Sequence, residues 1–330
     1  MLVKLDTLKQ TALTVLAHSG YPSDEAQTIL DVLLYAQLRG NNQGIVKLIG
    51  AGMPRHPETQ PIRIVRETKL SALLDGGRGA GMVAMRRAVD LAIEKARAHD
   101  VGIVGTNNTA SSTGAIGYYA GIAAQAGLIA FAFSGSGEYV AMHGSYEPLF
   151  GTNPLAIAVP TTGESPIVFD MATSAIARFG IIEAQTAGRR IPPDVAVDGS
   201  GQPTTDPTAA LAGAIRTFGG YKGAALAFMV EAFTHALVET TPTPEGKKTD
   251  WGNLVIAINP ALLTDAETFK ARVTALVVRA KATKKLLGVD EIMVPGERGN
   301  ALLARVLAAG EVEIDDNLWA ALSQKANASY

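Results

Sequence analysis

The sequence predicts an α/β protein in which short apolar strands alternate with amphipathic helices. Three observations support this class: short apolar runs recur from residue 71 onward, stretches with helical periodicity separate them, and glycine-bounded polar loops follow several of the runs. At 330 residues the chain is longer than a typical single domain. We therefore expect two interleaved or consecutive domains.

Two helices are expected first, over residues 6–18 and 24–38, because apolar residues repeat there at helical spacing. The expected strands are 71–74, 102–104, 128–133, 155–159, 167–169, 254–258 and 291–294, and the later helices are 82–98, 116–126, 224–238, 266–282, 301–309 and 317–328. Glycine, proline and threonine mark 191–207 as a long surface loop, and Thr240–Glu245 is expected to be a mobile loop.

Composition narrows the possible functions. The net charge is −2 with mixed signs throughout, so the chain carries no basic surface for nucleic acid or for an anionic membrane. There is no cysteine, which excludes disulfides, thiolate nucleophiles and iron–sulfur clusters. The first residues are charged, and the most apolar stretch is too short to span a bilayer. We therefore expect a cytoplasmic protein.

A glycine cluster, Asp75–Gly81, lies between an expected strand and an expected helix. Its glycines are spaced as G-x-G-x-G, whereas the fingerprint that binds dinucleotides in Rossmann domains is G-x-G-x-x-G. The cluster therefore favours a tight structural turn over a cofactor loop.

Polar loops after strands supply the candidate site residues. Ser134-Gly135-Ser136-Gly137 follows an apolar strand and is either a ligand-binding loop or a plain turn. Asp170 closes another strand, Lys222 stands between glycines, and His143 lies in a glycine-flanked loop, the one histidine expected to matter for function. The five histidines form no metal-binding pair, so no metal site is expected. No G-x-S-x-G elbow is present to support a serine hydrolase.

Several short motifs together resemble the malate/L-lactate dehydrogenase family, which is distinct from the Rossmann-type lactate dehydrogenases. Their order and spacing cover nearly the whole chain. They are Gly117-Tyr118-Tyr119-Ala120, Gly151-Thr152-Asn153-Pro154, Asp170-Met171-Ala172-Thr173-Ser174, Pro203-Thr204-Thr205-Asp206-Pro207, Gly219-Gly220-Tyr221-Lys222-Gly223 and Pro295-Gly296-Glu297-Arg298.

The resemblance implies a homodimer that reduces 2-oxo acids, or cyclic 2-imino acids, with NADH or NADPH. It implies a non-Rossmann α/β domain over residues 71–287 for cofactor binding and dimerisation, and a helical domain, residues 1–70 with 288–330, that carries the substrate loop. The implied cofactor contacts are Ser134, Ser136, Ile167, Val168, Phe169, Asp170, Met171, Ala172, Thr173, Tyr221, Lys222, Gly296, Glu297 and Arg298. Thr152 and Asn153 are implied to lie close to the nicotinamide or the substrate.

Two departures from the family pattern affect the chemistry. The family's first site motif, roughly G-x-x-S-H-G-x-x-R, carries its proton donor and its carboxylate-binding arginine. Here the segment is one residue shorter, with Gln43 in place of the histidine and Lys47 in place of the arginine. The family's N-H-F-G motif appears as Ser111-Ser112-Thr113-Gly114, so a second histidine is also absent.

These losses favour imine reduction. Glutamine donates a hydrogen bond but releases no proton at neutral pH, whereas a ketone that gains hydride needs a proton at its oxygen. A cyclic imine can be protonated before hydride arrives. Asn41, Asn42 and Gln43 could then direct amide oxygens at its N–H⁺, while Lys47 holds the carboxylate of a small substrate. Water or His143 could instead protonate a ketone.

Other functions remain open at this stage. A malate- or lactate-type dehydrogenase of 2-hydroxy acids could use another proton donor. A cofactor-binding protein that has lost catalysis would explain both missing histidines, although the cofactor motifs are present. A hydrolase using Ser134 or Ser136 has no convincing base.

Overall fold

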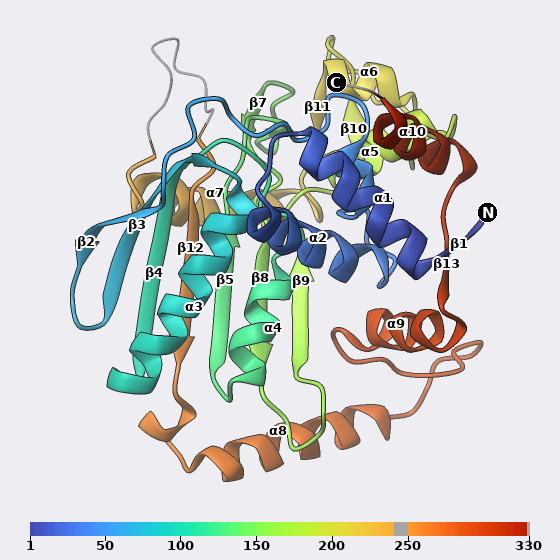
Figure 1. Cartoon of the computed structure of the whole chain (residues 1–330). Helices are drawn as coiled ribbons and strands as arrows, with labels where there is room; N and C mark the ends of the chain where they lie inside the picture. The colour runs from blue at the N-terminus through green and yellow to red at the C-terminus, as the bar shows by residue number, and fades with distance from the viewer. Residues whose placement is uncertain (241–249, 329–330) are drawn as a thin grey trace.

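The computed structural model describes residues 1–240 and 250–328, and a seven-stranded sheet runs through its centre (Figure 1). The strands lie in the order β2 (Arg63–Glu67), β3 (Ser71–Gly79), β4 (Val101–Thr109), β12 (Asn253–Ile258), β5 (Ile129–Ser134), β8 (Leu155–Val159) and β9 (Ile167–Met171). Within this sheet β3 and β4 are parallel, and the other neighbours are antiparallel. The predicted α/β class is confirmed.

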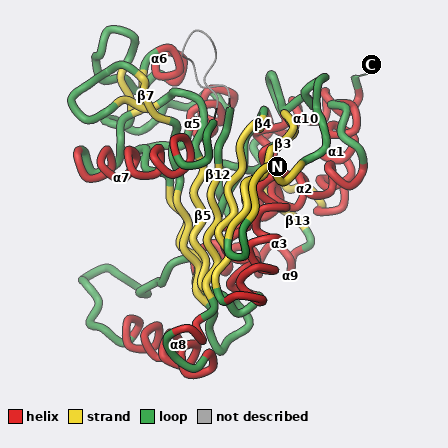
Figure 2. Tube along the Cα trace, turned by 90° about the vertical axis from the view of Figure 1, so that its left-hand side faces the viewer, coloured by secondary structure: helices red, strands yellow, loops and turns green. Residues whose placement is uncertain are grey.

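Helices cover both faces of the sheet (Figure 2). On one face lie α3 (Gly81–His99) and α4 (Gly117–Gln125), and on the other lies α7 (Tyr221–Glu231), which continues as the π-helical turn η2 (Ala232–Ala236). Alternate residues of β5 are buried, and two of them are alanines that share a core cluster with alanines of α4. Such small side chains let a helix approach a sheet closely.

The two ends of the chain meet beside this sheet. β1 (Leu2–Lys4) pairs with β13 (Glu311–Glu313), and α1 (Leu5–His18) packs against α2 (Ser23–Gln37) and α10 (Asp316–Asn327). One core cluster continues from α1 and α2 into the sheet layer. The domain boundaries near residues 70 and 288 stay a prediction.

A smaller four-stranded sheet packs over one end of the large one. Its order is β10 (Ala196–Val197), β11 (Ala214–Ile215), β6 (Val140–Ala141) and β7 (Pro148–Phe150). With α5 (Arg178–Thr186) and α6 (Pro207–Ala212) it encloses a separate core around Phe150 and Ile181. This unit places the start of α5 close to the end of the large sheet.

Three C-terminal elements follow β12 outside the two sheets. The short η3 (Pro260–Leu262) leads into α8 (Ala266–Lys281), which runs below the end of the sheet and has no buried residue, and α9 (Glu297–Ala309) follows it (Figure 1). No helix in the described part of the chain is both long and apolar enough to cross a bilayer.

The structure corrects several sequence predictions. The glycine cluster is no turn: β3 continues through it to Gly79, and Gly77, at φ +59°, has no room for a Cβ, which would lie 2.2 Å from the Gln60 carbonyl oxygen. No strand forms at 291–294, and α9 begins four residues before the expected 301. The edge strand β2 was not predicted, because its side chains are exposed. Apart from Thr240, the predicted mobile loop lies outside the described residues.

Candidate active site

The ends of five neighbouring strands of the large sheet line a cavity of about 590 Å³, which we call the main cavity because these strand ends meet in it. The segments that follow β4, β5 and β9 and those that precede β8 and β12 line it, together with the loop after α2 and the start of α5. Because neighbouring strands are antiparallel, carboxyl and amino ends alternate along this edge.

A row of buried hydrogen bonds joins these strand ends. The Ser134 hydroxyl donates to Thr113 Oγ1 at 3.0 Å, the Thr113 hydroxyl donates to Asn253 Oδ1 at 2.9 Å, and Asn253 Nδ2 donates to Thr106 Oγ1 at 2.9 Å. All four residues are buried, so each polar side chain needs such a partner. Thr113 and Ser134 line the floor of the cavity, and Asn253 of β12 and Thr106 of β4 support them from the interior.

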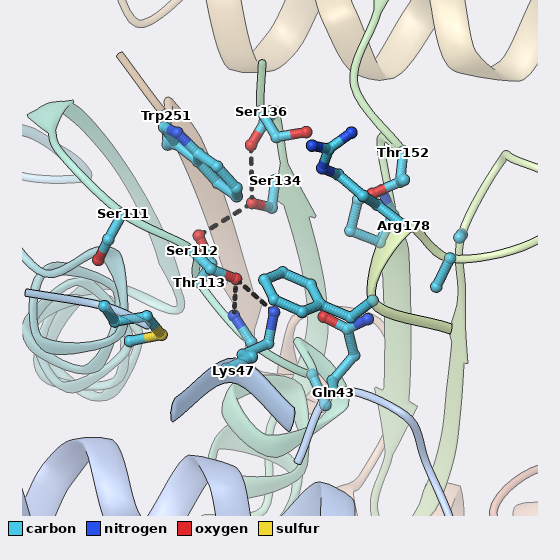
Figure 3. Close-up of a pocket in the computed structure, with 18 of the residues that line it drawn as sticks. Gln43, Lys47, Ser111, Ser112, Thr113, Ser134, Ser136, Thr152, Arg178 and Trp251 are labelled. Atoms are coloured by element: carbon cyan, nitrogen blue, oxygen red, sulfur yellow. Dashed lines mark hydrogen bonds between the residues drawn. The ribbon is translucent and has the colours of Figure 1, made fainter. Parts of the chain in front are cut away.

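The predicted substrate loop lies on the opposite wall (Figure 3). Gly40 ends α2 with positive φ, and Asn41, Asn42 and Gln43 then line the main cavity. The backbone N–H of Gln43 donates to Asn41 Oδ1 at 3.0 Å, which holds the loop in a tight turn. All three residues therefore line one cavity, and their contact with a substrate stays a prediction.

Lys47 follows on the 3₁₀ turn η1 (Ile45–Leu48) and also lines the main cavity, although it is only 1% exposed. Its ammonium donates to Ser112 Oγ at 2.8 Å and lies 3.4 Å from the centroid of the Phe179 ring. It forms no ion pair with any described residue. Burial lowers the pKa of the Lys47 ammonium well below its usual range.

Arg178, which the sequence analysis missed, is a second cation of the main cavity. It is the first residue of α5 (Figure 3). Its guanidinium carbon lies over the Tyr139 ring, 4.1 Å from the ring centroid. Among the described residues it has no carboxylate partner. A guanidinium held flat by an aromatic ring presents a fork that fits a carboxylate. Arg178 follows the Asp170–Ser174 motif closely in sequence, and this proximity was the one sequence signal that could have marked it as a site residue.

Asp170 is the next-to-last residue of β9 and lines the main cavity, as Ser134, Ser136 and Thr152 do. Its carboxylate accepts a hydrogen bond from the N–H of Gly117, the first residue of α4, at 2.8 Å. A Cβ on Gly117 would lie 2.9 Å from this carboxylate, so only glycine fits there. Burial raises the pKa of the Asp170 carboxyl to about 6, although the Gly117 bond opposes the shift.

A second hollow, beside the edge strand β9, begins at Asp170. Val168 and Phe169 line it from β9, and Gly296 and Arg298 line it from the start of α9. Gly296 adopts φ +85° directly before the helix, and Arg298 pairs with no described carboxylate. Helix N–H groups together with a free guanidinium fit a phosphate. Asp170, Asn41 and Asn42 line both spaces, so the second hollow adjoins the main cavity.

Met171 and Ala172 join Asp170 in the main cavity, but other predicted residues lie elsewhere. Asn153 and Thr173 are fully buried behind the wall, where Thr173 Oγ1 donates to the Asn153 carbonyl oxygen at 3.1 Å. Ile167 lines neither space, and Glu297 pairs with Lys281.

The structure does not bring His143 to the main cavity. Its loop lies over the small sheet, where His143 is exposed with its ring centroid 6.5 Å from that of Tyr221. Tyr221 and Lys222 begin α7 outside both spaces, and Tyr221 is 66% exposed. The histidine that does line the main cavity is His56, whose Nδ1 accepts the N–H of Glu58. The described residues contain no cluster of three potential metal ligands.

Comparisons with known proteins agree with this architecture. The malate/L-lactate dehydrogenase family model matches residues 3–323. L-sulfolactate dehydrogenase of Methanothermobacter thermautotrophicus is 36% identical over 318 residues, 92% of this chain and 90% of that protein. Delta(1)-pyrroline-2-carboxylate reductase 1 of Burkholderia ambifaria is 35% identical over 280 residues, 81% of this chain and 82% of that protein.

A solved structure extends the likeness to three dimensions. Malate dehydrogenase from Entamoeba histolytica superposes with a TM-score of 0.87 and 28% identity, and the match covers 100% of this chain and 99% of that one. These relatives are dehydrogenases and reductases, and their similarity over most of the chain identifies an NAD(P)-dependent oxidoreductase. The chain belongs to the malate/L-lactate dehydrogenase family.

The raised pKa of Asp170 predicts a pH-dependent stability. The unfolded carboxyl titrates near 3.9 and the folded one near 6, so its contribution to stability is fully present below about pH 4 and is lost as the pH rises through 6. Asp170→Asn cannot ionise. Between about pH 4.5 and 8 the free energy of unfolding of this variant should therefore fall less than that of the parent. The difference between the two falls should be on the order of 2 kcal/mol, measured by urea denaturation.

The matched control is Asp198→Asn. Hydrogen bonds from Ser200 and its neighbours lower the pKa of the exposed Asp198 carboxyl, so it stays charged across the same range. This control should lose as much stability as the parent. If the free energy of unfolding changed equally with pH in the parent and in Asp170→Asn, the raised pKa of Asp170 would be contradicted.

Proposed function

We propose that the protein reduces a small cyclic 2-imino acid, using hydride from NADH or NADPH. The observation that carries the proposal is that Gln43 lines the main cavity. In the sequence motif this residue stands in place of the family's proton donor. An amide cannot act as a general acid at neutral pH. A cyclic imine that is already protonated needs no such acid, because hydride addition to the iminium carbon yields the amine directly.

The polar groups of the main cavity suit such a substrate. The amide oxygens of Asn41, Asn42 and Gln43 are acceptors for an iminium N–H⁺, and Thr152 lies on the facing wall. Lys47 and Arg178 are cations for the substrate carboxylate. A volume of about 590 Å³ leaves room for a small ring beside a nicotinamide.

The proposed cofactor site continues into the second hollow. When bound, NADH or NADPH supplies the hydride. Arg298 and the start of α9 would hold a phosphate, while Ser134, Ser136, Asp170, Met171 and Ala172 would border the nicotinamide. This mode differs from that of a Rossmann domain, because β3 and β4 are the sole parallel neighbours in the described large sheet.

A second candidate is the reduction of a 2-oxo acid, or oxidation of the matching 2-hydroxy acid, with another proton donor. Its support is the relative named L-sulfolactate dehydrogenase, whereas the relative named Delta(1)-pyrroline-2-carboxylate reductase supports the imine. A protein that has lost catalysis altogether would oxidise no cofactor with either class of substrate.

The substrate preference can be tested directly. We expect the parent protein to turn over a cyclic 2-imino acid faster than the matching open-chain 2-oxo acid. Gln43→His should then raise 2-oxo acid turnover more than imine turnover, by about tenfold or more, because general acid catalysis contributes roughly 100- to 10,000-fold. Cofactor oxidation followed by absorbance measures both rates.

Gln43→Ala is the control, because it removes the amide without adding an acid and should not raise 2-oxo acid turnover. A parent protein that prefers pyruvate-like ketones would contradict the proposal. So would a Gln43→His variant with an unchanged ratio of the two rates.

The cofactor site has its own test. We expect Arg298→Ala to raise the Kd for NADH or NADPH by about tenfold or more, on the scale of one charge-assisted hydrogen bond. Arg279→Ala on α8 is the matched control. Lys222→Ala measures whether the start of α7 also takes part, and unchanged affinity would remove Lys222 from the site. Unchanged affinity in Arg298→Ala would instead overturn the phosphate assignment.

We also propose a homodimer. A helix as long as α8 with no buried residue is not stable by itself in water, and Leu276, Val278 and Leu286 expose apolar surface on or beside it. A second copy of the chain would cover this surface. Light scattering should report twice the chain mass of 34.4 kDa at micromolar concentration, and a monomer would refute the proposal.

A further inference from the structure

Lys47 is an unusual lysine, because it is fully buried, lacks a counter-charge and yet lines the cavity where the substrate is proposed to bind. An ammonium has three N–H donors. In the described chain one of them is used, by Ser112 Oγ, and the charge otherwise faces the Phe179 ring. The remaining donors are free for a ligand.

Several charged or titratable groups approach the main cavity from the surrounding elements, and none of them pairs with Lys47. They are Arg178 from α5, Asp170 from β9, Tyr139 before β6, Arg55 and His56 after η1, and Lys325 from α10 beside Gly52. Arg55 is neutralised by Glu25 at 3.2 Å. Asp170 is the one carboxylate without a cationic partner among these groups, so the cations outnumber the free carboxylates until an anion enters.

This environment favours the neutral amine in the empty site. Burial removes the hydration that stabilises an ammonium, and it is the cause of the lowered pKa of Lys47. A substrate carboxylate that enters the same space reverses the balance, because an opposite charge nearby favours the ammonium. Substrate binding and protonation of Lys47 are therefore linked.

We propose that Lys47 is the acid–base group of this site, taking up a proton when the anionic substrate binds and passing that proton to the imine nitrogen before hydride arrives. This inference rests on the proposed function. The lone pair of the imine nitrogen takes the proton from Nζ, which makes the substrate an iminium. Hydride from the reduced cofactor then adds to C2, and the π electrons of the bond between C2 and nitrogen become the lone pair of the product amine. The nicotinamide is oxidised, the substrate is reduced, and Lys47 returns to the neutral amine.

One ammonium can both bind the substrate carboxylate and donate the proton. In a 2-imino or 2-oxo acid the heteroatom at C2 and a carboxylate oxygen are neighbours on adjacent carbons. The free donors of Nζ can therefore bond both atoms at once. Lysine differs here from the family's arginine, which stays charged at all working pH values and has no proton to give. Lys47 would thus combine the roles that the family divides between two residues.

Calorimetry tests the proton uptake without turnover. The probe is pyrrole-2-carboxylate, a planar ring acid that accepts no hydride, titrated into the protein at about pH 8 in buffers of different ionisation enthalpy. The parent should take up a substantial fraction of one proton per site, on the order of 0.5 or more. Lys47→Arg should bind the probe with no uptake. Binding by the parent without proton uptake would overturn the proposal.

Two further variants distinguish the groups in the cavity. His56→Gln should leave the uptake unchanged, and its loss in that variant would assign the proton to His56. Ser112→Ala removes the hydrogen bond that favours the ammonium. We expect it to move the fall of kcat at high pH to a lower pH, and an unmoved profile would contradict the assignment. If Lys47→Arg does not fold, this smaller substitution still tests whether Lys47 is the acid–base group.

Kinetics separate proton transfer from carboxylate binding. Lys47→Arg keeps the charge, so KM should change little, whereas kcat should fall by about 100-fold or more when the acid is lost. A kcat within a few-fold of the parent would make Lys47 a binding residue only. If the parent reduces neither class of substrate, the proposed function fails, while proton uptake with the probe still reports on Lys47.

Discussion

The buried row from Ser134 through Thr113 and Asn253 to Thr106 is the interaction on which the site depends. It ties together the ends of three adjacent strands, and it does so with polar side chains that have no access to water. Losing one member would leave another buried and unpaired, which costs more than the bond itself contributes. The cavity floor is therefore a rigid polar surface against which a substrate and a cofactor could bind.

The opposite wall has a different physical character. Gln43 and its neighbouring asparagines present neutral amides, while Lys47 and Arg178 rest on the aromatic faces of Phe179 and Tyr139. An aromatic face partly compensates a cation without consuming its hydrogen-bond donors. Both cations thus remain available to a substrate, which an ion pair with a protein carboxylate would prevent.

Much of the fold and part of the site could be predicted from sequence. Periodicity located most helices and strands, and the motif order located Gln43, Lys47, Ser134 and Asp170, which the structure brings to one cavity. Periodicity failed where burial is unusual: β2 is exposed, and β3 runs on through glycines that look like a turn. The roles of Arg178 and Ser112 arise from packing between segments distant in sequence, so periodicity could not assign them. For Arg178 the one signal was its position shortly after the Asp170–Ser174 motif.

The arrangement of β12 also constrains how the chain reaches its folded state. This strand lies between β4 and β5, although it is synthesised long after both of them. Until residues 253–258 leave the ribosome, β4 and β5 have unpaired inner edges, and the polar row lacks Asn253. Such edges attract other strands and favour aggregation. Assembly of the central sheet and completion of the cavity floor therefore coincide as one late event in biosynthesis.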